Sequence, residues 1–282
     1  MSKQQIKFGE NLRYLRQQKR MTQKELSQGI CAQSMISAIE NGSYLPNISL
    51  AQQLAARLSI SIEDLSLSDY YNISSTDQTN KYLEKLCNAK EYQKLYQFLL
   101  QETTIEEVQT QEQVQAYYYY LGCCEYQLNK GELVAEKSFR MALLQIIDQP
   151  KFYASTLTRQ CYASLALTYL KYGQPQKCHV YFEKAFHALD KIPYEENQQI
   201  LYFLRAVSFW YQKELEDSIR WLELGTEFAV AHNSHYLLGN MYALKAQVYA
   251  AMNNIRESQK AQQVSDSFRA VFSEKSFFSD WT

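Results

Sequence analysis

Glycine and proline are scarce in this chain, with eight glycines and four prolines among 282 residues. Residues that interrupt helices are therefore few, while Leu, Ala, Gln, Glu and Lys are abundant, and this composition is typical of an all-α protein. The N-terminal MSKQQIKFGE has no apolar run typical of a signal peptide, and no uncharged apolar stretch is long enough to span a bilayer. We expect a cytoplasmic protein with no membrane partner.

Sequence signatures of common enzyme chemistry are also missing. There is no glycine-rich phosphate loop, no HExxH and no GxSxG, and the six cysteines show no CxxC or Cys/His metal spacing. We interpret the cysteines as small buried apolar residues, the alternative being a redox sensor at the Cys123-Cys124 pair. His232 and His235 are interpreted as a satisfied or solvent-exposed pair, the alternative being a metal site. No enzyme activity, cofactor or metal is expected.

Charge is divided unevenly along the chain. Residues 1–57 hold eight Lys/Arg and three Glu, a balance of +5, and since the whole chain carries −1 the other 225 residues carry −6. At 282 residues the chain is long enough for two domains that each have a core. Because the N-terminal part is basic and the rest of the chain is acidic, we expect only the N-terminal part to bind nucleic acid.

The stretch TQKELSQGICAQSMISAIENG, from Thr22 to Gly42, reads as two short helices joined by a tight turn. Thr22 and Glu25 have the spacing of a capping box for the first helix. In the second helix, apolar residues are spaced to face a core. Gly42 can end this helix in the left-handed conformation, which costs glycine little free energy. This is the pattern of a helix-turn-helix whose second helix enters the major groove of DNA.

The strings TQKELS, ICxQSxIS and IENG resemble the XRE/Cro type of helix-turn-helix. They resemble most the Rgg/PlcR branch of peptide-sensing regulators from Gram-positive bacteria, since phage repressors usually carry one more residue between Leu26 and Ile36. The resemblance implies a buried ion pair between Arg16 and Glu40. It also implies a regulator that dimerises on a palindromic operator in double-stranded DNA and responds to a short imported signalling peptide.

Six residues are the candidates for contacting DNA. Gln33, Ser34 and Ser37 lie on the exposed N-terminal part of the second helix, where side chains reach base edges. Gln23 and Asn41 match positions that contact phosphates in the family, and Lys24 is a weaker candidate for the same role.

Three further helices complete the expected N-terminal domain. One runs from Ile6 to Lys19, another begins at Asn47 or Ser49, and a short fifth helix covers Ile62 and Leu65. We therefore expect a five-helix DNA-binding domain over 1–67, a polar linker over 68–78 and a ligand-binding and dimerisation domain over 79–282.

The second domain contains a repeat of about forty residues with the order aromatic, small, aromatic, then small, large, small. This is the pattern of tetratricopeptide repeats, whose helix pairs stack into a right-handed superhelix, here with about five units. Tyr119, Tyr162, Tyr202 and Tyr242 are expected in the core. The matching sets are Tyr119, Cys123, Tyr126, Ala135, Phe139 and Ala142; Tyr162, Ala166, Tyr169, Cys178, Phe182 and Ala185; Tyr202, Ala206, Phe209, Ser218, Leu222 and Gly225; and Tyr242, Ala246, Tyr249 and Ser258, with a weaker copy at Leu83, Leu86, Leu95 and Leu99.

The inner face of this superhelix is the expected peptide site, because a peptide needs amide partners on an otherwise apolar wall. Family members often place asparagines on these helices, a feature that this chain lacks at the matching positions. The candidates are three amides, three aromatic side chains that fit a core role equally well, and one cation for a terminal carboxylate: Gln160, Asn240 and Gln247; Tyr120, Phe203 and Trp210; and Lys171.

The sequence thus predicts a transcriptional regulator controlled by a bound peptide. Two alternatives are an adaptor that is tethered to DNA while its repeats bind a protein partner, and an enzyme-regulating repeat protein of the Rap type, against which the intact recognition helix argues. A homodimer is expected through the repeat domain, helped by Tyr70 and Tyr71, because the C-terminal SFFSDWT is too apolar to be left in water.

Overall fold

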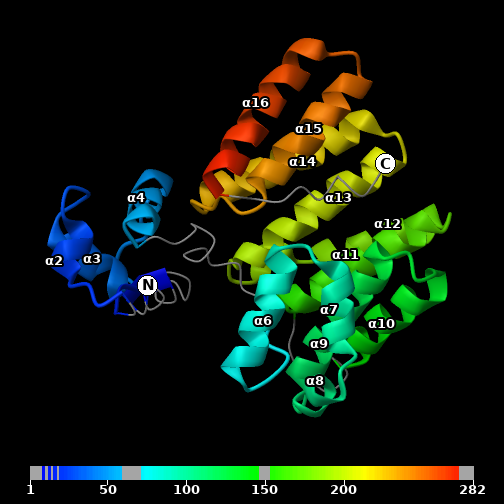
Figure 1. Cartoon of the computed structure of the whole chain (residues 1–282). Coiled ribbons are helices and arrows are strands. Elements are labelled where there is room, and N and C mark those ends of the chain that lie inside the picture. Colours follow the sequence, from blue (N-terminus) through cyan, green and yellow to red (C-terminus); the bar gives the residue numbers. More distant parts are fainter. Residues whose placement is uncertain are drawn as a thin grey trace. The chain divides into compact units, whose positions relative to one another are not determined.

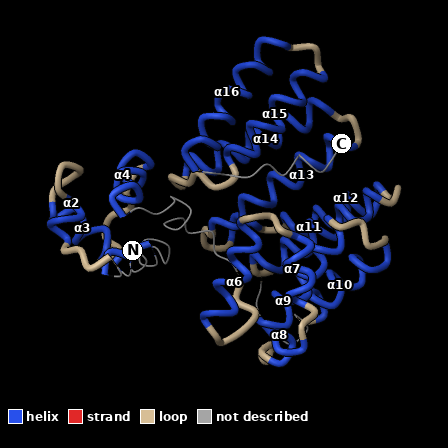
Figure 2. The backbone as a smooth tube through the Cα atoms, viewed as in Figure 1, coloured by secondary structure: helices blue, strands red, loops and turns tan. Residues whose placement is uncertain are grey.

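The computed structural model describes residues 8–9, 12–13, 15–17, 19–58, 71–145 and 153–272. Every regular element in these ranges is a helix (Figure 2), which confirms the predicted all-α class. None of the helices described there is long and apolar enough to cross a membrane. The predicted fifth helix, Tyr70 and the C-terminal SFFSDWT fall outside the described residues.

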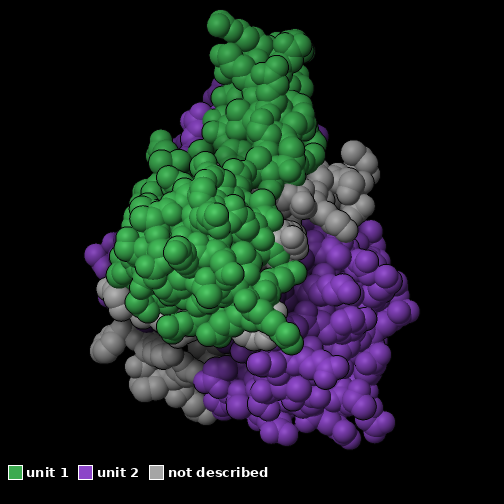
Figure 3. Space-filling model, turned by 60° about the vertical axis from the view of Figure 1, so that its left-hand side comes forward, with its two compact units in different colours: residues 1–68, 226–282 green, residues 69–225 purple. Residues whose placement is uncertain are grey.

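The chain divides into two compact units, one made of residues 1–68 and 226–282 and the other of residues 69–225 (Figure 3). The first unit contains the helix-turn-helix stretch and the last repeat helices. The second contains the remaining repeats. The domain boundaries at 67 and 79 stay a prediction.

The N-terminal stretch forms the helices that its caps predict (Figure 1). The described residues between 8 and 17 are helical, and α2 (Gln23–Ser27), α3 (Gln33–Glu40) and α4 (Ile48–Leu58) follow. Thr22 Oγ1 accepts a hydrogen bond from Glu25 N at 3.2 Å, and Glu25 Oε2 accepts one from Thr22 N at 2.6 Å, which completes the capping box. Asn47 Oδ1 caps α4 by accepting from Leu50 N at 2.9 Å.

These helices enclose a small apolar core, and Gly9 lets the first of them approach the end of α3. A Cβ atom at Gly9 would lie 2.2 Å from the carbonyl oxygen of Ile39, so only glycine fits there. Residues on four helices supply the core: Phe8, Leu12, Leu26, Ile36, Ile39, Leu50, Ala51, Leu54, Ala55 and Leu58.

Five helix pairs make up the described part of the repeat region. Short helices lie in the connections: α8 (Glu102–Glu106) and the 3₁₀ helices η1 (Leu189–Lys191) and η2 (Glu196–Gln198). The pairs are α6 (Asp77–Asn88) with α7 (Tyr92–Leu99), α9 (Gln111–Gln127) with α10 (Glu132–Leu144), α11 (Thr156–Lys171) with α12 (Pro175–Phe186), α13 (Gln199–Tyr211) with α14 (Leu215–Ala231), and α15 (Leu238–Ala251) with α16 (Ile255–Phe272).

Small residues lie where the paired helices approach each other. Ala166, Ala206 and Ala246 are buried, as the repeat pattern predicts. At Gly122 of α9, a Cβ atom would come within 2.8 Å of the ring of Phe139 on α10. The large residue on one helix therefore fills the space left by the small residue on its partner.

Two kinds of hydrogen bond recur at the forty-residue period. In the first, the hydroxyl of the second helix donates to a carbonyl of the first: Ser218 to Ala206 O at 3.0 Å and Ser258 to Ala246 O at 2.8 Å. In the second, the start of the first helix is tied to the second helix twenty-six residues later. These ties are Arg159 Nη1 to Ala185 O at 2.8 Å, Gln199 Nε2 to Gly225 O at 3.0 Å, and, with the donor reversed, Ser265 Oγ to Gly239 O at 2.8 Å.

The prediction for the repeat tyrosines is right for one of them and wrong for three. Tyr119 is buried, whereas Tyr162, Tyr202 and Tyr242 are only partly buried. Each of these three packs one side of its ring on an aromatic side chain of a second helix: Tyr162 on Tyr181 of α12, Tyr202 on Phe186 of α12 and Trp221 of α14, and Tyr242 on Phe268 of α16. The polar hydroxyl favours this position near the edge of the packing over a fully buried one.

Candidate nucleic-acid interface and ligand groove

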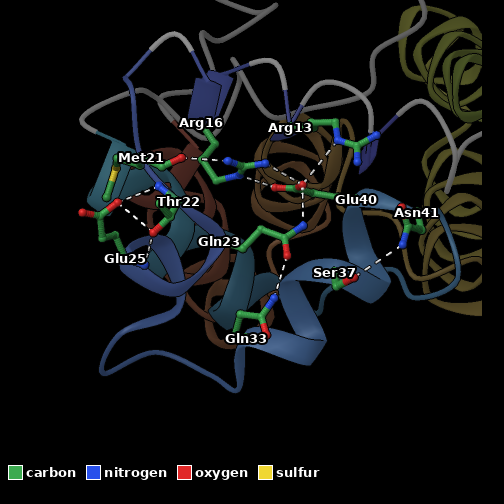
Figure 4. A network of polar contacts seen from close by, with 10 residues as sticks. All are labelled: Arg13, Arg16, Met21, Thr22, Gln23, Glu25, Gln33, Ser37, Glu40 and Asn41. Carbon is green, nitrogen blue, oxygen red and sulfur yellow. Dashed lines mark hydrogen bonds and ion pairs between the residues drawn. The ribbon is translucent and has the colours of Figure 1, made fainter.

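Glu40, the last residue of α3, is the centre of a polar network in the helix-turn-helix stretch (Figure 4). Its side chain is fully buried, and it accepts hydrogen bonds from Arg16 Nε at 2.5 Å and from Arg16 Nη2 at 2.9 Å. Arg16 Nη1 also donates to the carbonyl oxygen of Met21 at 2.7 Å. The forked contact joins the first helix to α3, as the implied ion pair requires.

The surroundings keep Glu40 ionised. Burial opposes ionisation, but the hydrogen bonds from Arg16 and Gln23 and the positive charges of Arg16 and Arg13 outweigh it, so the pKa of Glu40 is below its ordinary value. Arg13 contributes from the side, since its Nε lies 3.6 Å from Glu40 Oε2 and about half of its side chain is exposed. Glu40 is therefore a fixed, buried negative charge that faces two arginines.

Gln23 connects this buried charge to the recognition helix. Its Nε2 donates to Glu40 Oε2 at 2.9 Å, and its Oε1 accepts from Gln33 Nε2 at 2.7 Å. Because Glu40 accepts only, the amide of Gln23 is held in one orientation, with its oxygen toward Gln33. Gln33 begins α3 and is exposed, so the chain from Arg16 through Glu40 and Gln23 ends on a side chain at the surface (Figure 4).

The other predicted DNA-contacting residues take little part in the network. Ser34 and Lys24 are exposed, and Ser37 is partly exposed. Asn41 is exposed and has a long contact of 3.5 Å from its Nδ2 to Ser37 Oγ. The roles of these residues in contacting bases and phosphates stay predictions.

Four of the predicted ligand residues are buried. Gln160, Phe203, Asn240 and Tyr120 are 0, 1, 1 and 6 % exposed. Gln160 Nε2 donates to the carbonyl oxygen of Asn197 at 2.7 Å, so this amide joins α11 to the connection before α13. The prediction that these side chains contact a ligand remains untested.

The other three ligand candidates are at least partly accessible. Gln247 is exposed and Trp210 is partly exposed, and the ammonium of Lys213 lies 5.1 Å from the centre of the Trp210 ring. Lys171 is exposed, yet its Nζ donates to Asn129 Oδ1 and to Tyr126 O at 3.2 Å and lies 4.4 Å from the centre of the Tyr126 ring. Burial lowers the pKa of Lys171. This cation therefore already has intramolecular partners in the preceding repeat.

Tyr120 has a role that the sequence did not indicate. Its hydroxyl accepts a hydrogen bond from the backbone N–H of Tyr71 at 2.8 Å, and the ring of Tyr71 packs edge-on against Tyr119, with centres 6.1 Å apart. Asn80 Oδ1 accepts from the N–H groups of Ile73 and Ser74 at 3.0 and 3.3 Å. The segment that enters the repeats is therefore held by α9 and α6, and Tyr71 packs within its own chain.

The cysteines have the environment of buried apolar residues. Cys124, Cys161 and Cys178 are buried and Cys123 is partly buried, all as free thiols. Burial raises the pKa of Cys123 to about 12, despite hydrogen bonds from Tyr119 and Ser164, and raises the pKa of Cys124 further. A thiol that stays protonated is a poor nucleophile, which argues against the redox alternative at this pair.

Comparison with known proteins agrees with this geometry. Residues 12–65 match the family described as helix-turn-helix. A search among curated proteins found no match. Among solved structures, Bacillus thuringiensis PlcR in complex with the peptide PapR7 and DNA is similar, with 23 % identity, 95 % of this chain and 96 % of that chain covered, and a TM-score of 0.61.

The chain has the fold of PlcR. Two more structures share it at 15 % identity. ComR from S. thermophilus, in complex with DNA and its signalling peptide ComS, has a TM-score of 0.52, with 94 % of each chain covered. The Rap conjugation gene regulator of plasmid pLS20, in complex with the Phr* peptide, has a TM-score of 0.56, with 95 % of this chain and 76 % of that chain covered. The predicted architecture of a helix-turn-helix domain followed by helical repeats is confirmed.

Proposed function

We propose that this chain is a cytoplasmic, sequence-specific DNA-binding transcriptional regulator, controlled by a short signalling peptide that binds in its repeat region. The observation that carries the proposal is the helix-turn-helix of residues 12–65, in which a buried ionic network ends on the exposed Gln33 at the start of the recognition helix. An exposed amide at that place can pair with adenine in the major groove. A PlcR structure with the same fold holds both a peptide and DNA.

The regulator works as a homodimer. One head of this size buries too little DNA for tight specific binding, and heads of this kind pair on two half-sites about one helical turn apart. A palindromic operator then follows from the two-fold symmetry of the dimer. The peptide acts by linkage, because it binds one arrangement of the repeats better and so changes the population that is competent to bind the operator.

The proposal is tested by selecting duplexes from a random-sequence library with the full chain, alone and with a pool of short synthetic peptides. We expect enrichment of an inverted repeat, and one or more peptides that change its affinity. Failure to enrich any sequence under either condition would contradict the DNA-binding role. Enrichment with no response to any peptide would favour the adaptor alternative, in which the repeats bind a protein partner.

Gln33→Ala should weaken binding to the selected duplex by about 1–3 kcal/mol and change binding to a scrambled duplex little, because Gln33 reads a base edge. Lys24→Ala is the matched control. It should leave the sequence preference unchanged and lower the salt dependence by up to about one counterion, as expected for a phosphate contact. Titration of both duplexes at several salt concentrations measures both effects. Equal losses for Gln33→Ala on the two duplexes would contradict the base contact.

Asn240→Ala should reduce the effect of an active peptide on operator affinity while leaving peptide-free binding near that of the wild type. The reason is that the peptide site lies in the repeats, whereas the DNA contacts lie on α3. Operator titrations with and without the peptide measure the difference, and Gln247→Ala provides a comparison on an exposed residue of the same helix. A full peptide response in both variants would exclude this part of α15 from the site.

A further inference from the structure

Arg57, in the last turn of α4, reaches across to the turn of the helix-turn-helix. Its Nη1 donates to the carbonyl oxygen of Glu25 at 2.9 Å, and its Nη2 donates to that of Gln28 at 2.7 Å. The two acceptors lie in and just after α2, thirty-two and twenty-nine residues earlier in the chain, respectively. One guanidinium therefore joins α4 to the segment that sets the direction of α3.

Local structure gives this segment little stability of its own, although Leu26 of α2 packs in the apolar core. α2 has five residues, too few for a helix that is stable alone, and it ends at Gln28 in a non-helical conformation. The turn passes through Gly29 with φ +73°, a conformation that favours glycine.

The carbonyl groups at the end of α2 accept hydrogen bonds from donors other than the backbone of the helix. Ser27 Oγ donates to the carbonyl oxygen of Lys24, and the N–H groups of Ile30 and Cys31 donate to that of Ser27. Arg57 supplies the donors for the carbonyls of Glu25 and Gln28. A positive charge at this place also complements the negative end of the α2 dipole.

The fork shape of the guanidinium matters. Two parallel N–H groups on one plane bind two carbonyls three residues apart and fix their separation, which a single ammonium cannot do. The position of Gln33 depends on this separation, because α3 begins at that residue, five positions after Gln28. A shift of the turn would also strain the hydrogen bond between Gln33 and Gln23.

We propose that Arg57 is a positioning residue for DNA recognition, which holds the turn between α2 and α3 so that Gln33 meets the base edges in one orientation. The inference rests on the proposed function and adds to it a residue outside the recognition helix. Arg57 acts through the backbone of the turn and does not itself contact DNA.

The test uses full chains carrying Arg57→Ala, Arg57→Lys or, as control, Gln53→Ala. Gln53 is exposed on α4 and its side chain bonds to Ser49 of the same helix, so its loss leaves the turn untouched. The probes are the duplex selected by the wild-type chain and a scrambled duplex of equal length and composition. Both are titrated at several salt concentrations, below the melting temperature of every variant.

Arg57→Ala is expected to lose about tenfold in affinity for the selected duplex, as for the loss of a charged hydrogen-bond donor, and less than about twofold for the scrambled one. The salt dependence should stay that of the wild type. Arg57→Lys should fall between the wild type and Arg57→Ala, and Gln53→Ala should match the wild type.

Equal losses on both duplexes, with the salt slope reduced by about one, would overturn the inference and make Arg57 a phosphate contact. Wild-type affinity of both Arg57 variants for the selected duplex would also overturn it. If Arg57→Ala does not fold, Arg57→Lys decides, since wild-type discrimination by that variant would show that the fork is not needed. A wild-type chain that selects no duplex would overturn the proposed function first.

Discussion

Glu40→Gln is expected to abolish specific DNA binding and to lower the free energy of unfolding of the helix-turn-helix domain by roughly 3 kcal/mol. The substitution keeps the shape of the side chain but removes the charge that faces Arg16, whose side chain is 11 % exposed. Arg16 would then be a nearly buried cation without its anion. The new NH₂ group is itself a donor and would face the donors of Arg16 or Gln23. The hydrogen bond that orients Gln23 would then be lost, and Gln33, which bonds to Gln23, would lose its fixed position.

Chemical unfolding followed by circular dichroism gives the stability, and titration of selected and scrambled duplexes gives the binding. Glu25→Gln is the control, because Glu25 is an exposed carboxylate of the same motif. A double-mutant cycle with Arg16→Met should show a coupling energy of about 1–3 kcal/mol between Arg16 and Glu40. Additive losses in that cycle would show that the ion pair is not the source of the effect.

The network also sets a pH dependence for this domain. The pKa of Glu40 is lowered in the folded protein, so its stabilising contribution is complete above the ordinary glutamate value of 4.5 and is lost as the pH falls through the lower folded value. The wild type should therefore lose stability with falling pH in this window more steeply than Glu40→Gln. Parallel pH profiles for the two proteins would contradict this.

Arg159→Met is expected to lower the free energy of unfolding of the repeat region by roughly 4 kcal/mol, the cost of leaving several buried carbonyls without donors. Arg159 is 1 % exposed. It donates from Nε to Ala154 O at 3.0 Å and from Nη1 to Ala185 O and His187 O, each at 2.8 Å. These bonds close the C-terminal end of α12, where Ala188 adopts φ +50°. Burial lowers the pKa of Arg159, but a guanidinium remains charged.

The expected drop in melting temperature is about 10 °C. Arg220→Met is the control, because Arg220 is an exposed arginine on α14 and its loss should change stability little. Arg159→Lys should recover only part of the loss, since one ammonium cannot reach carbonyls on both sides of the α11–α12 pair. A melting temperature for Arg159→Met within a degree or two of the wild type would contradict this account.

Local sequence signals predicted most of the helix-turn-helix. The capping box at Thr22 and the cap at Asn47 depend on residues three positions apart, so the sequence alone contains both partners. The resemblance to known repressors added the pair Arg16 and Glu40. The repeat period likewise predicted which small residues are buried, because a side chain at the same place in each unit has the same neighbours.

Contacts to the backbone across long sequence separations were not predictable. Arg57 and Arg159 resemble ordinary surface cations in the sequence, because their acceptors are carbonyl groups that every residue possesses. The sequence predicts a phosphate contact for Gln23, whereas the bonds of its amide to Glu40 and Gln33 depend on rotamers that no sequence pattern reports. The packing of Tyr202 includes Phe186 of the preceding helix pair, which the single repeat does not specify.

The reversed donor in the last repeat limits how these units can be recombined. In a chimera that joined α15 to α14, the carbonyl of Gly239 would face the carbonyl of Gly225, and neither has a donor for the other. Joining α13 to α16 would instead bring together the amide of Gln199 and the hydroxyl of Ser265, which can bond to each other. Duplication or loss of a whole forty-residue unit preserves the bond between the two helices of each unit. A crossover between the two helices of the last two units preserves such a bond in only one of its two products. The array can therefore gain or lose repeats more readily than it can exchange half of one.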